Sequence, residues 1–143
     1  MNLELLKDRQ RTVVEEFGPW TASNIHLADH FYTIGEHIQG DEVKLRRILQ
    51  VVSDTVSKPL EAIRLLDLAC HEGIYAIEFA RHGANVFGIE GRQAHIEKAM
   101  FVKDALSLSN VDFVQDDVRN LSKAKYGSFD VVLCLGILSL GCA

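Results

Sequence analysis

The stretch between residues 65 and 90 constrains the fold of this chain most, because its apolar pattern changes period twice. Residues 65–68 are apolar except for Asp67, a turn follows, and apolar residues then recur at the helical spacing of Ile74, Ile77 and Ala80. A second apolar run ends at Glu90. The pattern predicts a strand, a tight turn, a helix and a second strand, which is the repeating unit of a parallel sheet.

The turn and the acid at the end of the second strand predict the class of ligand. A carboxylate about 20 residues beyond such a turn can accept hydrogen bonds from both ribose hydroxyls, and Glu90 has this place. A dinucleotide fold needs G-x-G-x-x-G so that its backbone can approach a pyrophosphate, but this turn offers Ala69, His71 and Gly73. A ligand with ribose and adenine but no phosphate fits better, and S-adenosylmethionine is the common one. A nicotinamide-dependent oxidoreductase is the weaker alternative, because the phosphate-binding glycines are missing.

Residues 67–73 read D-L-A-C-H-E-G and resemble the first motif of the class I S-adenosylmethionine-dependent methyltransferases, which is roughly D-L-G-C-G-x-G. Ala69 and His71 replace two of the three glycines. The similarity extends to residues 88–92 for the ribose acid, 114–118 for the adenine edge and 129–134 for a fourth strand. These motifs follow one another at the spacing of the family, so the resemblance is specific when they are taken together.

The resemblance implies an α/β fold, a Rossmann-like parallel sheet with helices on both faces. The family sheet has the strand order 3-2-1-4-5-7-6, and only the first four strands are found here, so the C-terminal strands are missing. We expect an N-terminal helical cap over residues 1–60 and a partial cofactor-binding domain over residues 61–143. In the cap, the pattern predicts a helix ending before Gly18, a loop-rich stretch over 17–38, and a helix capped by Asp41.

By resemblance, the first strand and its turn bind the methionine end of the cofactor. Asp67 would orient the turn or the amino-acid group, and the backbone at Ala69 and Gly73 would approach the methionine portion. Glu90, followed by Gly91, would bind the ribose. The alternatives are a solvent-linked strand carboxylate at Asp67, helix-to-strand packing at the small residues, and an exposed loop acid at Glu90.

The third motif implies the adenine site. Asp117 resembles the acid that accepts from the adenine amino group, the backbone of Val118 would pair with the ring edge, and Asp116 is the neighbouring candidate. The alternative is a solvated Asp-Asp turn. Leu135, at the end of the fourth strand, completes the predicted cofactor-binding set.

Several histidines and aromatic residues have two interpretations. His71 either lies over the cofactor or is a loop histidine with no task. The spacing of His26, Asp29 and His30 would suit a metal only if the segment were helical, and methyl transfer is an in-line displacement that needs no ion, so no metal site is predicted. The aromatic residues of the cap are expected mainly in the core, although Tyr32 is a candidate lid over the cofactor; they are Trp20, Phe31 and Tyr32. The sequence assigns no catalytic base.

The composition bounds the partners and the compartment. The chain has 143 residues, of which 48% are hydrophobic, and a net charge of -5, which suits one soluble globular domain. The acidic balance argues against nucleic-acid binding, which needs a basic face. The 3 cysteines form no CxxC pair and no apolar run approaches the ~20 residues of a membrane span, so a cytoplasmic protein is expected.

The predicted function is methyl transfer from S-adenosylmethionine to an unidentified small-molecule acceptor. We expect the chain as given to be weakly active or inactive, because the strands that would enclose an acceptor are absent. The alternative is a non-catalytic S-adenosylmethionine-binding or dimerisation module. The fourth strand would remain an apolar sheet edge, so we expect a homodimer through this strand and the tail after Leu135.

Overall fold

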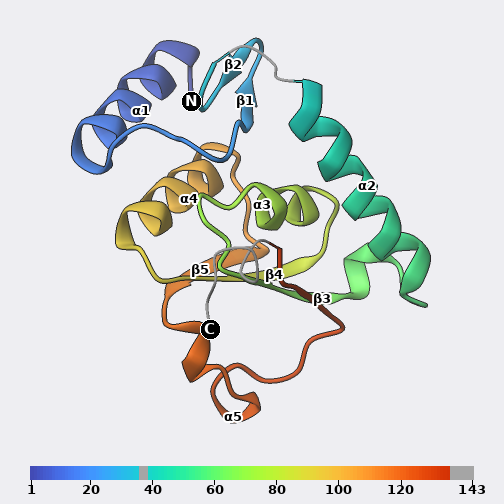
Figure 1. Ribbon diagram of the computed structural model, residues 1–143. Coiled ribbons are helices and arrows are strands. Elements are labelled where there is room, and N and C mark those ends of the chain that lie inside the picture. Colours follow the sequence, from blue (N-terminus) through green and yellow to red (C-terminus); the bar gives the residue numbers. More distant parts are fainter. Residues whose placement is uncertain (36–38, 136–143) are drawn as a thin grey trace.

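The computed structural model describes residues 1–35 and 39–135, and its centre is a parallel sheet of 4 strands (Figure 1). The strand order is β5-β4-β3-β6, which confirms the predicted order 3-2-1-4. The strands are β3 (Arg64–Leu68), β4 (Asn85–Glu90), β5 (Val111–Gln115) and β6 (Val131–Leu133). The registers pair Asp67 with Gly88 on one side and with Leu133 on the other, so the first predicted strand lies inside the sheet.

The helices cover the two faces of the sheet unequally. The crossover helices α3 (Ile74–Arg81) and α4 (Gln93–Ala105) lie on one face, together with α2 (Gln39–Thr55) and α1 (Leu3–Phe17). In the described part of the chain the other face carries only the short helix α5 (Lys123–Tyr126) and its flanking segments (Figure 1). The described chain also has two single 3-10 turns, η1 (Leu60–Ala62) and η2 (Val118–Asn120).

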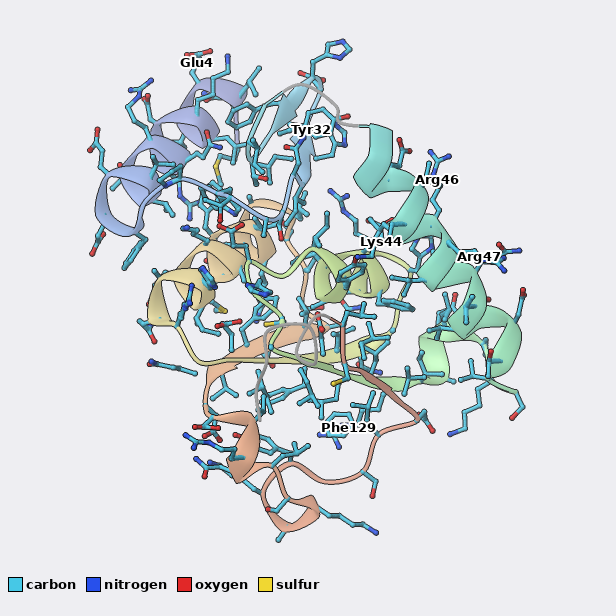
Figure 2. All side chains as sticks on the ribbon, in the orientation of Figure 1. Glu4, Tyr32, Lys44, Arg46, Arg47 and Phe129 are labelled. Carbon is cyan, nitrogen blue, oxygen red and sulfur yellow. The ribbon has the colours of Figure 1, made fainter. Side chains whose placement is uncertain are left out.

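The strand residues divide between two hydrophobic clusters because successive side chains point to opposite faces. Leu65 is buried in the larger cluster with residues of the helices, whereas Leu66 and Leu68 are buried in the smaller one. Phe129 and Tyr126 pack against that smaller cluster, and Figure 2 shows Phe129 on the face of α5. Burial on both faces explains why the strand reads as a nearly continuous apolar run.

The N-terminal segment shares the larger core with the sheet. Leu6 and Trp20 belong to the same buried cluster as Leu65 and Phe101, and the rings of Trp20 and Phe101 are 5.6 Å apart. The first predicted helix is confirmed: it ends at Phe17, because Gly18 takes a φ of +85°. The expected division into a cap and a binding domain at residue 60 stays a prediction.

Three local expectations are wrong. The stretch 17–38 holds an antiparallel hairpin of β1 (His26–Ala28) and β2 (Phe31–Tyr32), whose strands are too short for a period to show in the sequence. Asp41 does not cap α2, because that helix already begins at Gln39. The fourth strand is shorter than predicted, since β6 covers only Val131–Leu133.

Gly88 on β4 has no room for a side chain. A Cβ at this position would lie 2.6 Å from Cδ1 of Phe113 and 2.9 Å from Sγ of Cys70. We therefore expect Gly88→Ala to lower the free energy of unfolding by about 1–3 kcal/mol through overpacking, measured by urea denaturation. Gly91→Ala is the matched control, because nothing lies within 4 Å of a Cβ there. Equal stability of the two variants would contradict this account of the sheet.

Candidate functional site

The turn after β3 has a backbone with three left-handed residues at alternate positions. Ala69, His71 and Gly73 have φ values of +53°, +52° and +89°. These are the three places where the resembled motif has glycine, and a left-handed conformation costs an ordinary L-residue roughly 1–2 kcal/mol. The glycine-type backbone is therefore kept although two of the glycines are replaced.

Gly73 is needed for packing at this turn. A Cβ there would lie 3.1 Å from both the Cβ of Ala99 and the ring of Phe113, so the start of α3 approaches α4 and β5 closely. Gly73 does not line either of the cavities described below. The packing interpretation is thus supported by direct contacts, while its predicted approach to the methionine portion stays a prediction.

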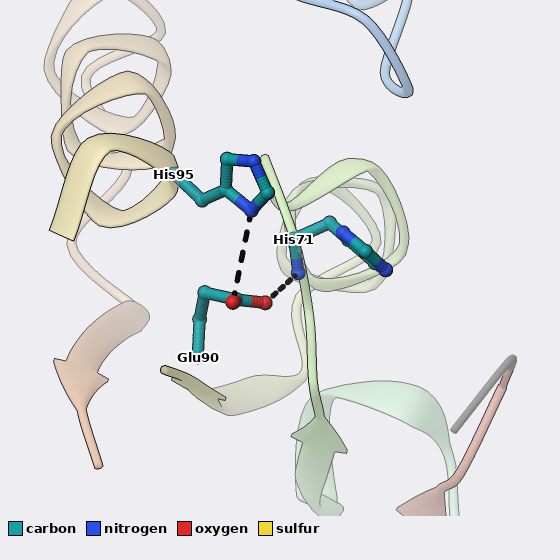
Figure 3. Close-up of side chains that lie close together, drawn as sticks. All are labelled: His71, Glu90 and His95. Carbon is teal, nitrogen blue, oxygen red and sulfur yellow. Dashed lines mark hydrogen bonds and ion pairs between the residues drawn. The ribbon is translucent and has the colours of Figure 1, made fainter. Parts of the chain in front are cut away.

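Glu90 ends β4 and ties it to the turn (Figure 3). Its Oε2 accepts a hydrogen bond of 2.8 Å from the backbone N–H of His71, and its Oε1 accepts one of 3.1 Å from the N–H of Arg92. The residue is only 6% exposed, so it is not an exposed loop acid. It is a buried acid at the carboxyl end of the sheet, where α/β folds bind ligands.

His95 lies on the first turn of α4 beside this acid. Its Nδ1 is 3.6 Å from Oε1 of Glu90. Burial lowers the pKa of His95, although the charges of Glu90 and Glu72 act in the opposite direction. No role was expected for His95, because a histidine near a helix start carries no periodic signal.

Asp67 is a buried carboxyl group with one unsatisfied oxygen. Within the described residues its Oδ2 has no hydrogen-bond partner. Burial raises its pKa to about 7, a hydrogen bond from the backbone of Ala76 opposes this, and the charge of Glu90 adds to it. The folded protein therefore holds this proton more tightly than the unfolded chain does, and Asp67 reduces stability as the pH rises from about 4 to 7. A cationic group beside it would stabilise the carboxylate.

Two cavities meet at Ala69 on the carboxyl edge of the sheet. The first has a volume of about 230 Å³ and is lined by Asp67, Ala69, His71 and Leu135, together with residues of the cap and α3. The second, of about 470 Å³, is lined by Ala69, Gly91, Gln115, Asp116, Asp117 and Val118. All the predicted cofactor residues except Gly73 and Glu90 line one of these cavities.

The cap and α3 add side chains to the first cavity that the sequence did not single out. Ser23, Lys44 and Tyr75 line it. Figure 2 shows Lys44 projecting from α2 toward α3, whereas Arg47 projects to the opposite side of the helix. The cavity thus has a cationic side chain on its cap wall and the Asp67 carboxyl on its sheet wall.

The two acids after β5 are both engaged by nearby side chains, and they differ in exposure. Asp116 accepts from Lys125 Nζ at 2.6 Å and from the hydroxyl of Tyr126, and the Lys125 hydrogen bond is the main reason that its pKa lies well below the usual range. Asp117 caps η2 through the N–H of Arg119, whose side chain also lowers the pKa of Asp117 to about 2. Both remain ionised at neutral pH, and Asp117 is the more exposed side chain.

The aromatic residues and histidines of the cap within residues 1–35 line neither of these cavities. Trp20 is buried in the core, as expected. Tyr32 stacks on His26 with ring centroids 4.8 Å apart, and both line a separate cavity of about 310 Å³ between the hairpin, α2 and α3. His26 lies in a strand and its Nε2 contacts the carbonyl of Asp29, so the helical spacing that would have suited a metal is not present.

Glu72 and Lys98 form a buried ion pair that sequence reasoning missed. Their charged atoms are 3.0 Å apart, and Glu72 is 0% exposed. The Glu72 carboxylate also accepts from the backbone N–H groups of Thr21, Ala22 and Ser23, at distances from 2.7 to 3.1 Å. The sequence feature that could have revealed the pair is Lys98, a lysine among the apolar residues on the buried face of α4.

Comparison with known proteins identifies the family. A family model described as "Methyltransferase domain" matches residues 65–142, more than half of the chain. The chain belongs to this family. The methyltransferase domain is 31% identical over 75 residues to a ubiquinone biosynthesis O-methyltransferase of Acinetobacter baylyi, covering 52% of this chain and 32% of that protein. It is 32% identical over 81 residues to the protein of the same name from Maricaulis maris, with coverages of 57% and 32%. The chain thus spans about a third of these relatives.

Solved structures agree with this assignment. The crystal structure of EvdMO1 superposes with a TM-score of 0.69 at 27% identity, over 94% of this chain and 29% of that one. The N-terminal domain of EvdMO1 with SAH bound superposes with a TM-score of 0.68 at 26% identity, over 92% and 54%. The Rossmann-like fold of the methyltransferase domain is therefore confirmed.

The buried ion pair can be tested by removing one charge. We expect Glu72→Gln to lower the free energy of unfolding by about 3–5 kcal/mol, because Lys98 is left as an uncompensated buried charge. Urea denaturation followed by circular dichroism measures this. Asp112→Asn is the control, since it breaks the exposed pair with Lys103 and should cost less than about 1 kcal/mol.

A double variant separates the charge from the packing. Glu72→Gln combined with Lys98→Met should recover part of the lost stability, because no charge then remains alone in the core. Equal, small losses for Glu72→Gln and Asp112→Asn would contradict the structural role of the pair.

Proposed function

We propose that this methyltransferase domain binds S-adenosylmethionine across the two joined cavities and transfers its methyl group to a small-molecule acceptor. The observation that carries the proposal is Glu90, a buried acid at the tip of β4 beside the turn where the cavities meet. Membership of the family and the SAH-bound domain of EvdMO1 support it.

The second cavity would take the adenosine portion. Asp117 would accept from the adenine amino group, with the backbone of Val118 at the ring edge. Asp116 is the less accessible acid, because its side chain is the more buried of the two. Glu90 would accept from the ribose hydroxyls while sharing its oxygens with the backbone of the turn, and Gly91 leaves open space beside it.

The first cavity would take the amino-acid end and the sulfonium. The ligand ammonium would lie beside Asp67, whose unsatisfied oxygen gains a cationic partner. Lys44 would pair with the ligand carboxylate from the opposite wall. Ala69 and Leu135 would contact the uncharged part of the chain. A zwitterionic ligand thus matches the two charges that line this cavity.

The reaction would be an in-line displacement, in which the acceptor atom bonds to the methyl carbon while the carbon–sulfur bond breaks. Such a step depends on positioning and on the exclusion of water, and Ser23 of the cap and Tyr75 of α3 line the cavity where the sulfonium would lie. The O-methyltransferase relatives favour an acceptor hydroxyl. We assign no catalytic base.

The role of Glu90 is tested by ligand binding. We expect Glu90→Gln to weaken the binding of S-adenosylhomocysteine (SAH) about ten- to hundredfold, because charge-assisted hydrogen bonds to the ribose are worth about 1.5–3 kcal/mol. Isothermal titration calorimetry on the folded variant measures the change. Glu97→Gln is the control, since the Glu97 carboxylate accepts a hydrogen bond from the exposed Gln93 side chain on the same helix. Unchanged affinity in Glu90→Gln would refute the ribose assignment.

We also propose a homodimer that forms through β6 and a cytoplasmic location. β6 is an edge of the sheet, and Val132 on it is 51% exposed. The tail from 136 to 143, which was expected to take part, lies outside the described residues.

The cytoplasmic location is supported by the free thiols of Cys70 and Cys134, which suit a reducing compartment. None of the described helices is long and apolar enough to cross a membrane.

The assembly can be measured by sedimentation at micromolar concentration. We expect a species of twice the 16.0 kDa of the chain, because pairing of two apolar edges removes both from water. Val132→Lys should shift the population to the monomer, since a lysine on an edge strand opposes pairing. A monomer for the unchanged chain would refute the proposal.

A further inference from the structure

Three side chains with metal-binding atoms converge at the tip of β4 (Figure 3). His71 comes from the turn after β3, Glu90 from the end of β4, and His95 from the first turn of α4. One ligand atom of each lies within 4.8 Å of the others. The two imidazole rings are 5.4 Å apart between centroids. The proposed binding of S-adenosylmethionine does not use the two imidazoles together.

His95 points an unsatisfied nitrogen at this cluster. Its Nδ1 is buried and has no hydrogen-bond partner among the described residues. Oε1 of Glu90 lies 3.6 Å from this nitrogen, which is beyond hydrogen-bond distance. A buried nitrogen without a partner costs free energy, and an ion between the nitrogen and the carboxylate would remove that cost.

We propose that His71, Glu90 and His95 form a binding site for a divalent transition metal, with Zn²⁺ as its representative. Two imidazoles and one carboxylate are a donor set that holds Zn²⁺ while leaving a fourth position for water. The nitrogen donors favour Zn²⁺ over Mg²⁺ or Ca²⁺, which prefer oxygen ligands.

The movement needed for binding is small. Donors about 2.0–2.2 Å from a tetrahedral ion are roughly 3.3–3.5 Å from one another. His95 and Glu90 are already at about this separation. His71 is only partly buried, so rotation of its side chain can bring its ring nitrogen closer. Glu90 can ligate through one oxygen while the other keeps a backbone N–H bond.

The site overlaps the ribose site, which rests on the proposed function. Glu90 cannot bind an ion and both ribose hydroxyls in the same way at once. The metal and the nucleoside therefore exclude each other, and free Zn²⁺ acts as a competitor of S-adenosylmethionine. The family motif has glycine at the position of His71, so this chain can hold an ion at a place where the motif offers no side chain.

The first experiment uses the metal alone. Zn²⁺ is titrated into the full chain by calorimetry, and Co²⁺ is used as a spectroscopic probe of the ligands. We expect one high-affinity ion per chain, with a Co²⁺ spectrum of nitrogen and oxygen ligation that excludes the thiols. His71→Gly and His95→Asn should each weaken binding at least tenfold. His82→Asn is the matched control, because His82 contacts only the partly exposed Glu78 carboxylate. No ion bound at micromolar Zn²⁺, or binding that neither variant weakens, overturns the site.

The second experiment measures competition. SAH binding is titrated at several Zn²⁺ concentrations. We expect its apparent affinity to fall as Zn²⁺ rises in the unchanged chain, and this fall to be much weaker in His95→Asn. Zn²⁺ binding with no effect on SAH overturns the overlap. Zn²⁺ binding to a chain that binds no SAH refutes the proposed function and leaves the metal site standing, so the two failures are distinguishable.

Discussion

The ion pair of Glu72 and Lys98 is the interaction on which the site depends, because it joins three segments in the core. Removing two charged groups from water costs free energy unless each polar atom has a hydrogen-bond partner. Here the Glu72 carboxylate accepts hydrogen bonds from the backbone N–H groups of residues 21–23 as well as from Lys98. Lys98 in turn donates to the carbonyl of Pro19. The pair therefore holds the cap loop against the turn, and Ser23 of that loop becomes a wall of the first cavity.

The second constraint is the strained backbone of the turn. Ala69 and His71 keep a left-handed conformation that glycine would adopt more easily. Hydrogen bonds to β4 hold it, since Cys70 donates to the carbonyl of Ile89 at 3.0 Å and His71 donates to Glu90. The acid proposed for the ribose is thus also a structural support of the turn. For this reason both the affinity for SAH and the free energy of unfolding must be measured for a variant of Glu90.

The regular elements were predictable because each has a local period. The strand, helix and strand expected within residues 65–90 are β3, α3 and β4, and the helix expected before Gly18 is α1. The strand order followed from the resemblance. The errors lie where local signals are weak: the hairpin strands are too short to show a period, and the start of α2 was placed at Asp41 because an aspartate commonly caps a helix.

The sequence by itself determined the α/β class, the strand order and several of the residues that line the two cavities, because periodic burial and motif spacing are local properties of the chain. Only the tertiary structure decided which polar side chains interact with one another. It buried Glu72 against Lys98, engaged Asp116 with Lys125, and brought His71 to Glu90 and His95. These contacts join residues of different helices, strands and loops, and whether a polar side chain is buried or solvated depends on the elements packed around it. No local pattern encodes that environment.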